Sequence, residues 1–271
     1  MNRTDKKKTN PLFLKPLIII LAIAIYVRFF YIRPVEAEIK AKEALPLEKD
    51  APGKYVKVGK YKIHVQIRGE QNFGSEIVPL VLLHGWSTAA GITWLPWAEE
   101  LAKTRTVIIP DMLGLGYSQR VTEPCFELTH KGQAKMLVEV LDALGVKKFD
   151  LVGRSLGGAI SAELALDYPD RLRRLVLMAA YIYQTNAFAD FFHKLGNIPF
   201  GIGKALTWNS MGGGPKGTAT KNFAKGKNIE RYKITLIKGT VDSLRTWAAT
   251  PQATRLPDLG LIRNPTMVLW G

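Results

Sequence analysis

The most constraining feature of the sequence is the stretch from residue 152 to residue 158, which reads Val-Gly-Arg-Ser-Leu-Gly-Gly. An apolar run at 149–152 precedes it, and a helix-like segment at 156–168 follows it. A Gly-x-Ser-x-Gly sequence between a strand and a helix is typical of a nucleophile elbow, a sharp turn that exposes its serine at the top of a sheet. Ser155 is therefore a candidate nucleophile. The alternative is a glycine-rich turn that carries an incidental serine.

Composition limits what the rest of the chain can be. The 271 residues, 47% of them hydrophobic, are enough for one large domain with a full core. The single cysteine, Cys125, excludes an internal disulfide framework and a cysteine-based metal site. The net charge of +15 is concentrated toward the two ends, and no nucleic-acid-binding motif accompanies it. Nucleic acid is therefore not an expected partner, while attraction to anionic lipid and a merely solvated basic face both remain open.

The N-terminal segment suggests a membrane anchor. Residues 1–10 are basic, and residues 11–32 are almost wholly apolar apart from Lys15 and Arg28. The charge-free part is shorter than the roughly 20 residues of a spanning helix. However, the flanking charges can reach the membrane interfaces, where the aromatic residues 29–31 would also lie. We expect residues 1–33 to form a basic tail and an uncleaved single-pass anchor, with the domain on the extracytoplasmic side. The alternatives are a cleaved signal peptide, which would give a secreted protein, and a buried or interfacial helix.

The remaining residues alternate between strand and helix patterns. Residues 34–53 are expected to be a linker that consists of a short helix or stalk and then Ala51-Pro52-Gly53. Two alternating runs joined by Gly59-Lys60 then predict a hairpin at 54–68, in which His64 is expected to be half-exposed. A continuously apolar run at 78–83 and further runs at 106–109, 149–152 and 172–179 predict buried strands, with helical segments at 94–102, 129–144 and 156–168 between them. This order predicts an α/β fold with a mostly parallel, doubly wound sheet and an antiparallel N-terminal hairpin.

Three polar side chains follow directly after predicted strands. They are His84, Asp111 and Ser155. Because ligands of such sheets bind beyond the carboxyl ends of the strands, we expect these three residues to mark the site.

Three motifs now give a family resemblance. They are Leu83-His84-Gly85-Trp86, Asp111-x-x-Gly114-x-Gly116-x-Ser118 and Gly153-x-Ser155-x-Gly157-Gly158, in that order along the chain. The sequence resembles the α/β-hydrolase family over about residues 53–271, and its ending, 262–271, is similar to that family's penultimate core strand. Within the family it looks closest to membrane-anchored monoacylglycerol-lipase-like proteins and bacterial lipases or esterases. The resemblance implies a first part of the core at 54–180, a helical cap insert at 181–262 and a core strand at 263–271.

The resemblance also implies a role for each matching position. Ser155 would be the nucleophile, and the backbone N–H groups of Trp86 and Leu156 would form the oxyanion hole. His84 would brace the loop that begins at Gly85, and Asp111 would hold the 114–118 loop by hydrogen bonds; we expect neither to transfer protons. The elbow itself would be shaped by Gly153 and Gly157.

The sequence departs from the family pattern after the insert. In the family, the acid and then the histidine of the catalytic triad follow the nucleophile. Here the chain stops at Trp270-Gly271, the Trp-Gly after which the acid usually follows. We therefore expect a C-terminally truncated sequence whose triad acid and histidine lie beyond Gly271. His193, Asp242 and Asp258 precede that strand, and we expect none of them to substitute.

The expected activity is hydrolysis of a carboxylic ester, with a lipophilic small molecule as substrate. The aromatic residues of the insert would suit an acyl chain. No cofactor and no metal are expected. The serine at the elbow argues against dehalogenase and epoxide-hydrolase chemistry, for which the family uses an aspartate. The alternatives are a peptidase, a thioesterase, a C–C bond hydrolase, an acyltransferase or, if the chain ends at Gly271, a catalytically inactive hydrolase-like membrane protein.

Overall fold

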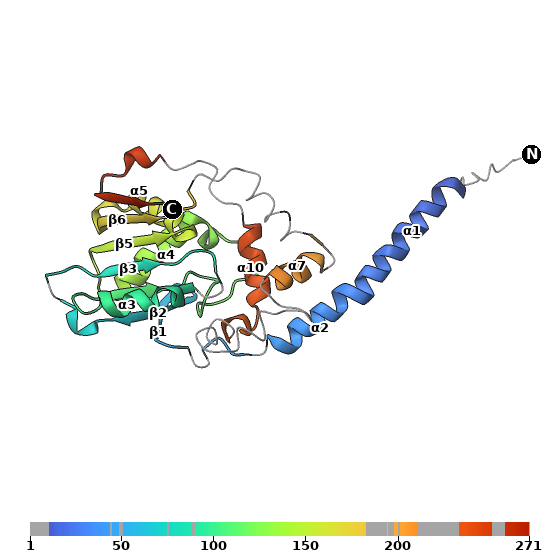
Figure 1. Ribbon diagram of the computed structural model, residues 1–271, viewed down its shortest axis with the longest axis horizontal. Coiled ribbons are helices and arrows are strands. Elements are labelled where there is room, and N and C mark those ends of the chain that lie inside the picture. The colour runs from blue at the N-terminus through green and yellow to red at the C-terminus, as the bar shows by residue number, and fades with distance from the viewer. Residues whose placement is uncertain are drawn as a thin grey trace, which may run out of the picture.

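The computed structural model describes residues 11–43, 45–48, 51–74, 76–87, 90–182, 194, 198–199, 201–210, 233–250 and 258–270. Figure 1 shows three parts: a body built around a sheet, two insert helices beside it, and a long N-terminal helix that projects away. We call residues 181–262 the insert. We call the N-terminal helix the rod; it consists of α1 (Pro11–Val27), a π-helical turn (Arg28–Ile32) and α2 (Arg33–Lys42).

One seven-stranded sheet forms the body, in the order β1-β2-β4-β3-β5-β6-β7. Its strands are β1 (Lys54–Val58), β2 (Tyr61–Arg68), β3 (Leu80–Leu83), β4 (Val107–Pro110), β5 (Phe149–Arg154), β6 (Leu172–Met178) and β7 (Thr266–Leu269). The pairs from β4 through β7 are parallel, whereas β1 and β2 form the antiparallel hairpin that the Gly59-Lys60 turn predicts. The sheet therefore has the predicted mostly parallel topology with an antiparallel edge.

The continuous apolar strands are buried on both faces. Val81 and Leu83 point into the larger core, where α4 (His130–Ala143) and α5 (Leu156–Asp167) pack. Leu80 and Leu82 point to the opposite face, which is covered by α3 (Leu95–Leu101). Because successive strand residues alternate between faces, an uninterrupted apolar strand implies helices on both sides of the sheet.

Helix α4 begins and ends where the sequence predicts. The side-chain oxygen of Thr129 accepts a hydrogen bond of 3.0 Å from the backbone N–H of Gly132, which is an N-terminal cap. The helix ends before Gly145, whose φ of 74° belongs to the left-handed region. These local signals set the ends of α4, which packs beside α5.

The rod packs against the insert through α2, which lies where the sequence suggested a short helix or stalk before a linker. Val35 and Ile39 of α2 are buried in one cluster with Ala205, Trp208 and Val241. These partners belong to α7 (Ile202–Ser210) and α10 (Thr240–Ala249), the two insert helices between the rod and the body in Figure 1. The spacing of four residues between Val35 and Ile39 places both on one face of α2, so the segment presents an apolar stripe to the insert.

Strand β7 occupies the edge opposite the hairpin. It pairs in parallel with β6, and its four side chains are exposed. The core packing expected for this strand is thus not seen among the described residues.

Candidate active site

The chain turns sharply at Ser155, between β5 and α5. Ser155 has φ 52° and ψ −117°, a conformation that a residue with a side chain rarely adopts. Its backbone N–H donates to the Met178 carbonyl (3.0 Å), and its own carbonyl accepts from the Tyr181 N–H (2.9 Å). The end of β6 therefore holds the strained turn, and the half-exposed Ser155 side chain stands beyond the carboxyl end of β5.

The motif glycines are required by close approach of neighbouring backbone. A Cβ at Gly157 would lie 2.4 Å from the His84 carbonyl oxygen, and a Cβ at Gly153 would lie 2.2 Å from Ser161 Oγ. Contacts this short do not occur for real Cβ atoms. The first turn of α5 can therefore lie against the end of β3 only if these positions lack a side chain.

The loop after β3 passes directly beside the serine. A Cβ at Gly85 would lie 3.0 Å from Ser155 Cβ, and Trp86 follows in the chain. Leu156 begins α5, and backbone N–H groups in the first turn of a helix have no partner within that helix. The structure thus brings the chain at Gly85-Trp86 and the N-terminus of α5 together at Ser155, the arrangement from which an oxyanion hole is built.

His84 joins this loop to the one after β4. Its Nδ1–H donates to the Gly85 carbonyl (2.8 Å), and its Nε2 accepts from the Met112 N–H (3.0 Å). The side chain is completely buried, and burial lowers its pKa, so the imidazole is neutral. With both ring nitrogens occupied, His84 has no nitrogen left to accept a proton from Ser155.

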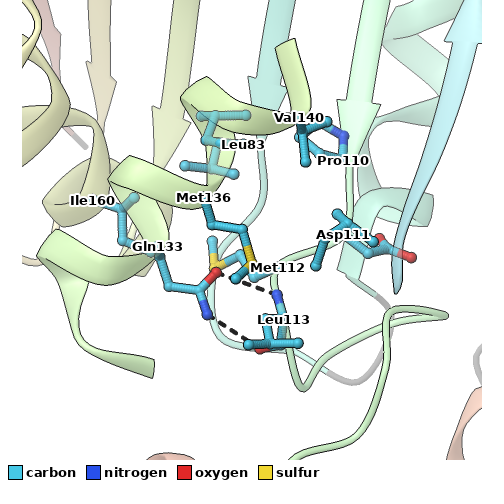
Figure 2. Close-up of a pocket in the computed structure, with 11 residues that line it drawn as sticks. Leu83, Pro110, Asp111, Met112, Leu113, Gln133, Met136, Val140 and Ile160 are labelled. Atoms are coloured by element: carbon cyan, nitrogen blue, oxygen red, sulfur yellow. Dashed lines mark hydrogen bonds between the residues drawn. The ribbon is translucent and has the colours of Figure 1, made fainter. Parts of the chain in front are cut away.

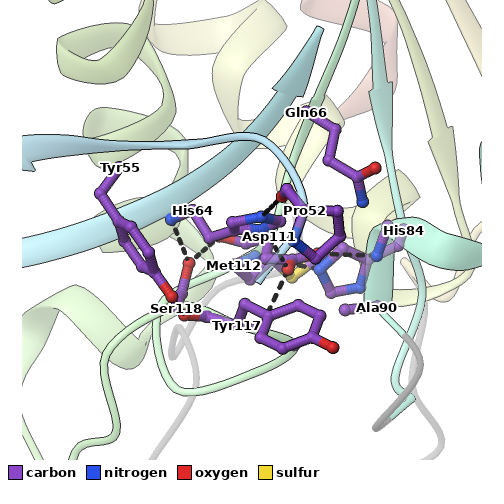
Figure 3. A network of polar contacts seen from close by, with 12 residues as sticks. Pro52, Tyr55, His64, Gln66, His84, Ala90, Asp111, Met112, Tyr117 and Ser118 are labelled. Carbon is purple, nitrogen blue, oxygen red and sulfur yellow. Dashed lines mark hydrogen bonds and ion pairs between the residues drawn. The ribbon is translucent and has the colours of Figure 1, made fainter. Parts of the chain in front are cut away.

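A buried polar network surrounds Asp111 (Figure 3). Its carboxylate accepts from the N–H of Gly91 (2.7 Å) and from the N–H of Tyr117 (2.9 Å), and it pairs with His64 Nδ1 (2.8 Å). Burial alone would raise the pKa of Asp111, but the hydrogen bond and charge of His64 lower it below its ordinary value. Asp111 therefore ties together the two loops at the carboxyl end of the sheet as a buried anion.

His64 corrects a sequence-based prediction. It was expected to be half-exposed, yet it is completely buried. Its Nδ1–H donates to Asp111 and its Nε2–H donates to the Pro52 carbonyl oxygen. Because both partners can only accept, both ring nitrogens carry protons and the ring is cationic. Burial opposes that charge, but Asp111 outweighs it and raises the pKa of His64. The alternating pattern of β2 could not reveal a charge partner 47 residues away.

Hydrogen bonds from two helices hold the backbone of Leu113, which follows Met112. The backbone N–H of Leu113 donates to Gln133 Oε1 of α4 (3.2 Å), and its carbonyl accepts from Trp247 Nε1 of α10 (2.8 Å). Figure 2 shows the hydrogen bonds between Gln133 and Leu113. The cavity behind these residues, about 20 Å³ and mostly apolar in lining, has room for about one water molecule and not for a substrate.

Helix α10 also reaches the loop at Gly85-Trp86. The rings of Trp247 and Trp86 meet edge to face, with centroids 5.7 Å apart and planes at 72°. Ser243 Oγ donates to the Gly114 carbonyl (2.9 Å) and accepts from the Val121 N–H (3.2 Å). Sequence reasoning missed these contacts of α10, because no local pattern links α10 to loops more than 120 residues earlier.

A general base for Ser155 is not found among the described residues. No described histidine hydrogen-bonds to Ser155 Oγ, since His64 and His84 are engaged elsewhere and His130 lies at the start of α4. His193 lies outside the described residues. Asp242 pairs with Lys204 (2.7 Å) and Asp258 accepts from the Gly260 N–H (3.0 Å). Within the same described ranges, no group of three or more His, Cys, Asp or Glu residues could hold a metal ion.

Comparison with known proteins agrees with this geometry. The family model described as "alpha/beta hydrolase fold" matches residues 78–203. The enol-lactonase from Burkholderia xenovorans LB400 superposes with a TM-score of 0.61, at 19% identity over 79% of this chain and 80% of that one. Residues 78–203 thus match the α/β-hydrolase fold family, and the chain has the fold of the enol-lactonase.

Curated relatives are similar over less than half of this chain. The 2-hydroxymuconate semialdehyde hydrolase of Pseudomonas sp. (strain CF600) is 40% identical over 135 residues, 48% of this chain and 46% of that protein. The human (lyso)-N-acylphosphatidylethanolamine lipase is 31% identical over 118 residues, 42% of this chain and 32% of that protein. The matches thus span less than half the length of either relative.

Proposed function

We propose that this protein is a serine hydrolase in which Ser155 is the nucleophile and the N–H groups of Trp86 and Leu156 form the oxyanion hole. The observation that carries the proposal is the strained backbone of Ser155, φ 52°, at a turn where β3, β5 and α5 converge. Such strain is retained where the surrounding structure enforces it, and it is typical of functional positions. A merely structural glycine-rich turn would not need a side chain at a positive φ.

The geometry supports acyl transfer to water. Ser155 Oγ would attack the substrate carbonyl carbon while a general base takes its proton, and the carbonyl electrons would move onto the oxygen. The two N–H groups would stabilise that oxyanion until the leaving group departs with the proton; one such donor is worth about 2.7–4 kcal/mol. Water would then attack the acyl-enzyme and release the acid. The base must come from outside the described residues.

The proposed substrate is a lipophilic carboxylic ester. Trp86 is 44% exposed beside Ser155, and its ring contacts Trp247 of the insert. We propose that the insert caps the site and that these aromatic rings contribute an apolar wall, which suits an acyl chain better than a charged group. The similarity to the human lipase supports the same substrate class.

A second candidate is hydrolysis of a carbon–carbon bond. The 40% identity with a 2-hydroxymuconate semialdehyde hydrolase favours it specifically. Both reactions would use the same serine turn and the same oxyanion hole, so the described geometry suits each of them.

A substrate panel with Ser155→Ala tests both candidates. The full-length protein in detergent is assayed with p-nitrophenyl butyrate, p-nitrophenyl laurate and 2-hydroxymuconate semialdehyde. The control is Thr104→Ala, which removes an exposed hydroxyl group from the turn between α3 and β4. We expect turnover of the laurate ester to fall by about 10⁵-fold or more in Ser155→Ala and to be unchanged in Thr104→Ala. Turnover of only the semialdehyde would establish the second candidate, and activity retained in Ser155→Ala would contradict both.

We also propose that the rod is an uncleaved membrane anchor with the domain on the extracytoplasmic side. The helix from Lys15 to Lys42 is long and apolar enough to span a membrane or to be a signal sequence. Contacts with the insert favour retention, because Ile32 is only 1% exposed and Tyr31 Oη accepts from Asn209 Nδ2 (2.6 Å). An N-terminal epitope tag should stay with the domain in the carbonate-washed membrane fraction, and deletion of residues 1–33 should release the domain. Loss of the tag from the mature protein would establish a cleaved signal instead.

A further inference from the structure

Glu43, the residue directly after α2, lies at the start of α10. Its Oε1 accepts from the Val241 N–H (2.7 Å) and its Oε2 accepts from the Gly239 N–H (3.1 Å). Glu43 is 9% exposed, and α10 has no side-chain cap of its own, because its N-cap residue is Gly239, with φ 85°. The carboxylate therefore occupies the position of a helix N-cap, where a negative charge also interacts favourably with the helix dipole. Glu43 lies 196 residues from Gly239 and 198 residues from Val241 in the sequence.

Two further contacts fix the same junction. The backbones of Leu45 and Ile237 form a parallel bridge, with the Leu45 N–H donating to the Leu236 carbonyl (3.1 Å). Val35 and Ile39 pack against α7 and α10 in a buried cluster. The end of the rod and the beginning of α10 are thus joined by an apolar contact, a backbone bridge and a buried carboxylate.

The other end of α10 lies on the active-site loops. Trp247, in its last turn, donates to the Leu113 carbonyl and packs edge-on against Trp86. The beginning of α10 is also connected to these loops. The Oγ1 atom of Thr240, its first residue, accepts from Arg120 Nε (3.0 Å), and the same guanidinium donates to the carbonyls of Gly116 and Ser118. A displacement of α10 would therefore move the Trp86 ring and remove hydrogen bonds from the loop that Asp111 holds.

We propose that Glu43 is a positioning residue of the active site: by capping α10 from the end of the rod, it holds Trp247 against the oxyanion loop at Trp86. It touches no reacting atom and acts through α10. The N-terminal segment thereby becomes part of the scaffold of the site as well as a tether. The effect on catalysis rests on the proposed function, whereas the effect on the loops does not.

Hydrogen–deuterium exchange of the full-length protein in detergent tests the structural claim without any assay of activity. Glu43→Ala is compared with Glu38→Ala, a control about one turn earlier on α2 whose carboxylate binds only the Lys42 ammonium in the described chain. We expect exchange at 240–247 and 113–118 to rise about fivefold in Glu43→Ala, as for loss of a helix cap, and to stay unchanged in Glu38→Ala. Equal exchange in the two variants would overturn the proposal. If Glu43→Ala does not fold, Glu43→Gln, which keeps one acceptor oxygen, is judged by the same comparison.

Kinetics with a double mutant then separate positioning from general destabilisation. With p-nitrophenyl laurate, Glu43→Ala and Trp247→Phe should each lower kcat more than they raise KM, and their combination should lower kcat little more than either one alone. Fully additive effects would show that Glu43 does not act through Trp247 and would overturn the proposal. If the wild-type protein hydrolyses none of the panel substrates, the proposed function fails and the exchange result still decides the role of Glu43.

Discussion

Helix α10 connects the loops at the carboxyl ends of β3, β4 and β5 with the junction of the rod and the insert, but the two regions are held in different ways. The loops are fixed by backbone and by buried charge: Gly157 against the end of β3, and Asp111 between the N–H groups of two loops. The junction is fixed by the apolar cluster around Ile39, by the Glu43 carboxylate and by a single backbone bridge between Leu45 and Ile237. The first arrangement leaves little room for adjustment, whereas the second can loosen without unfolding the sheet.

The largest expected loss of stability is at Asp111. In Asp111→Ala, the buried cation of His64 loses its partner and two N–H groups lose their acceptor, so the free energy of unfolding should fall by about 3–5 kcal/mol. Urea denaturation followed by tryptophan fluorescence measures this. The control is Asp142→Ala, which removes a carboxylate that is 57% exposed and paired with Arg171, and it should change stability by less than about 0.5 kcal/mol. If both variants lose the same small amount, the buried pair does not hold the loops.

Ile39→Ala tests the junction. The truncated side chain leaves a cavity whose local cost is about 2–5 kcal/mol. We expect this cost to appear as faster hydrogen exchange in α7 and α10, while β3 and β5 keep their protection. A matched control on the same helix is the exposed Ala37→Ser. Loss of protection in β3 and β5 would mean that the two regions unfold as one unit and do not differ in how they are held.

Gly157→Ala tests the backbone packing of the elbow. A methyl group 2.4 Å from the His84 carbonyl must push α5 away from β3, at a cost of about 1–3 kcal/mol. Ester turnover should fall with it, because Leu156 and Ser155 move together. Gly145→Ala, at a helix end where an added Cβ has open space around it, controls for the loss of a glycine without a steric clash. Full activity in Gly157→Ala would contradict the close packing.

The smallest expected effect is a dependence of stability on pH. The pKa of His64 is raised above its ordinary value of 6.5. The contribution of the His64–Asp111 pair to the free energy of unfolding is therefore complete below pH 6.5 and is lost as the pH rises through the raised pKa. Asp111, whose pKa is lowered from 3.8, acts in the opposite sense and loses its contribution only as the pH falls through that lowered value. Urea midpoints between about pH 6 and pH 9 should therefore decline, and His64→Gln should flatten the slope. An unchanged slope in that variant would show that His64 is not the titrating group.

The same contrast explains what could be predicted from the sequence. The hairpin, the parallel strands and the elbow follow from local patterns, because alternation, apolar runs and a Gly-x-Ser-x-Gly turn each describe neighbouring residues. The hydrogen bonds of His84 and Asp111 to adjacent loops also lie close to their motifs. The charged state of His64 and the capping of α10 by Glu43 depend on partners brought together only by the tertiary fold, and no periodicity in β2 or α2 indicates them. The same holds for Trp247, which composition suggests only as an aromatic residue of the insert.

The most direct test of Ser155 as the nucleophile is covalent labelling. The full-length protein is treated with a fluorophosphonate probe, which reacts with activated serines, and the labelled peptide is identified by mass spectrometry. We expect a single adduct on Ser155, abolished in Ser155→Ala and preserved in Thr104→Ala. An unlabelled protein, or an adduct on a different serine, would contradict the assignment of Ser155 as the nucleophile.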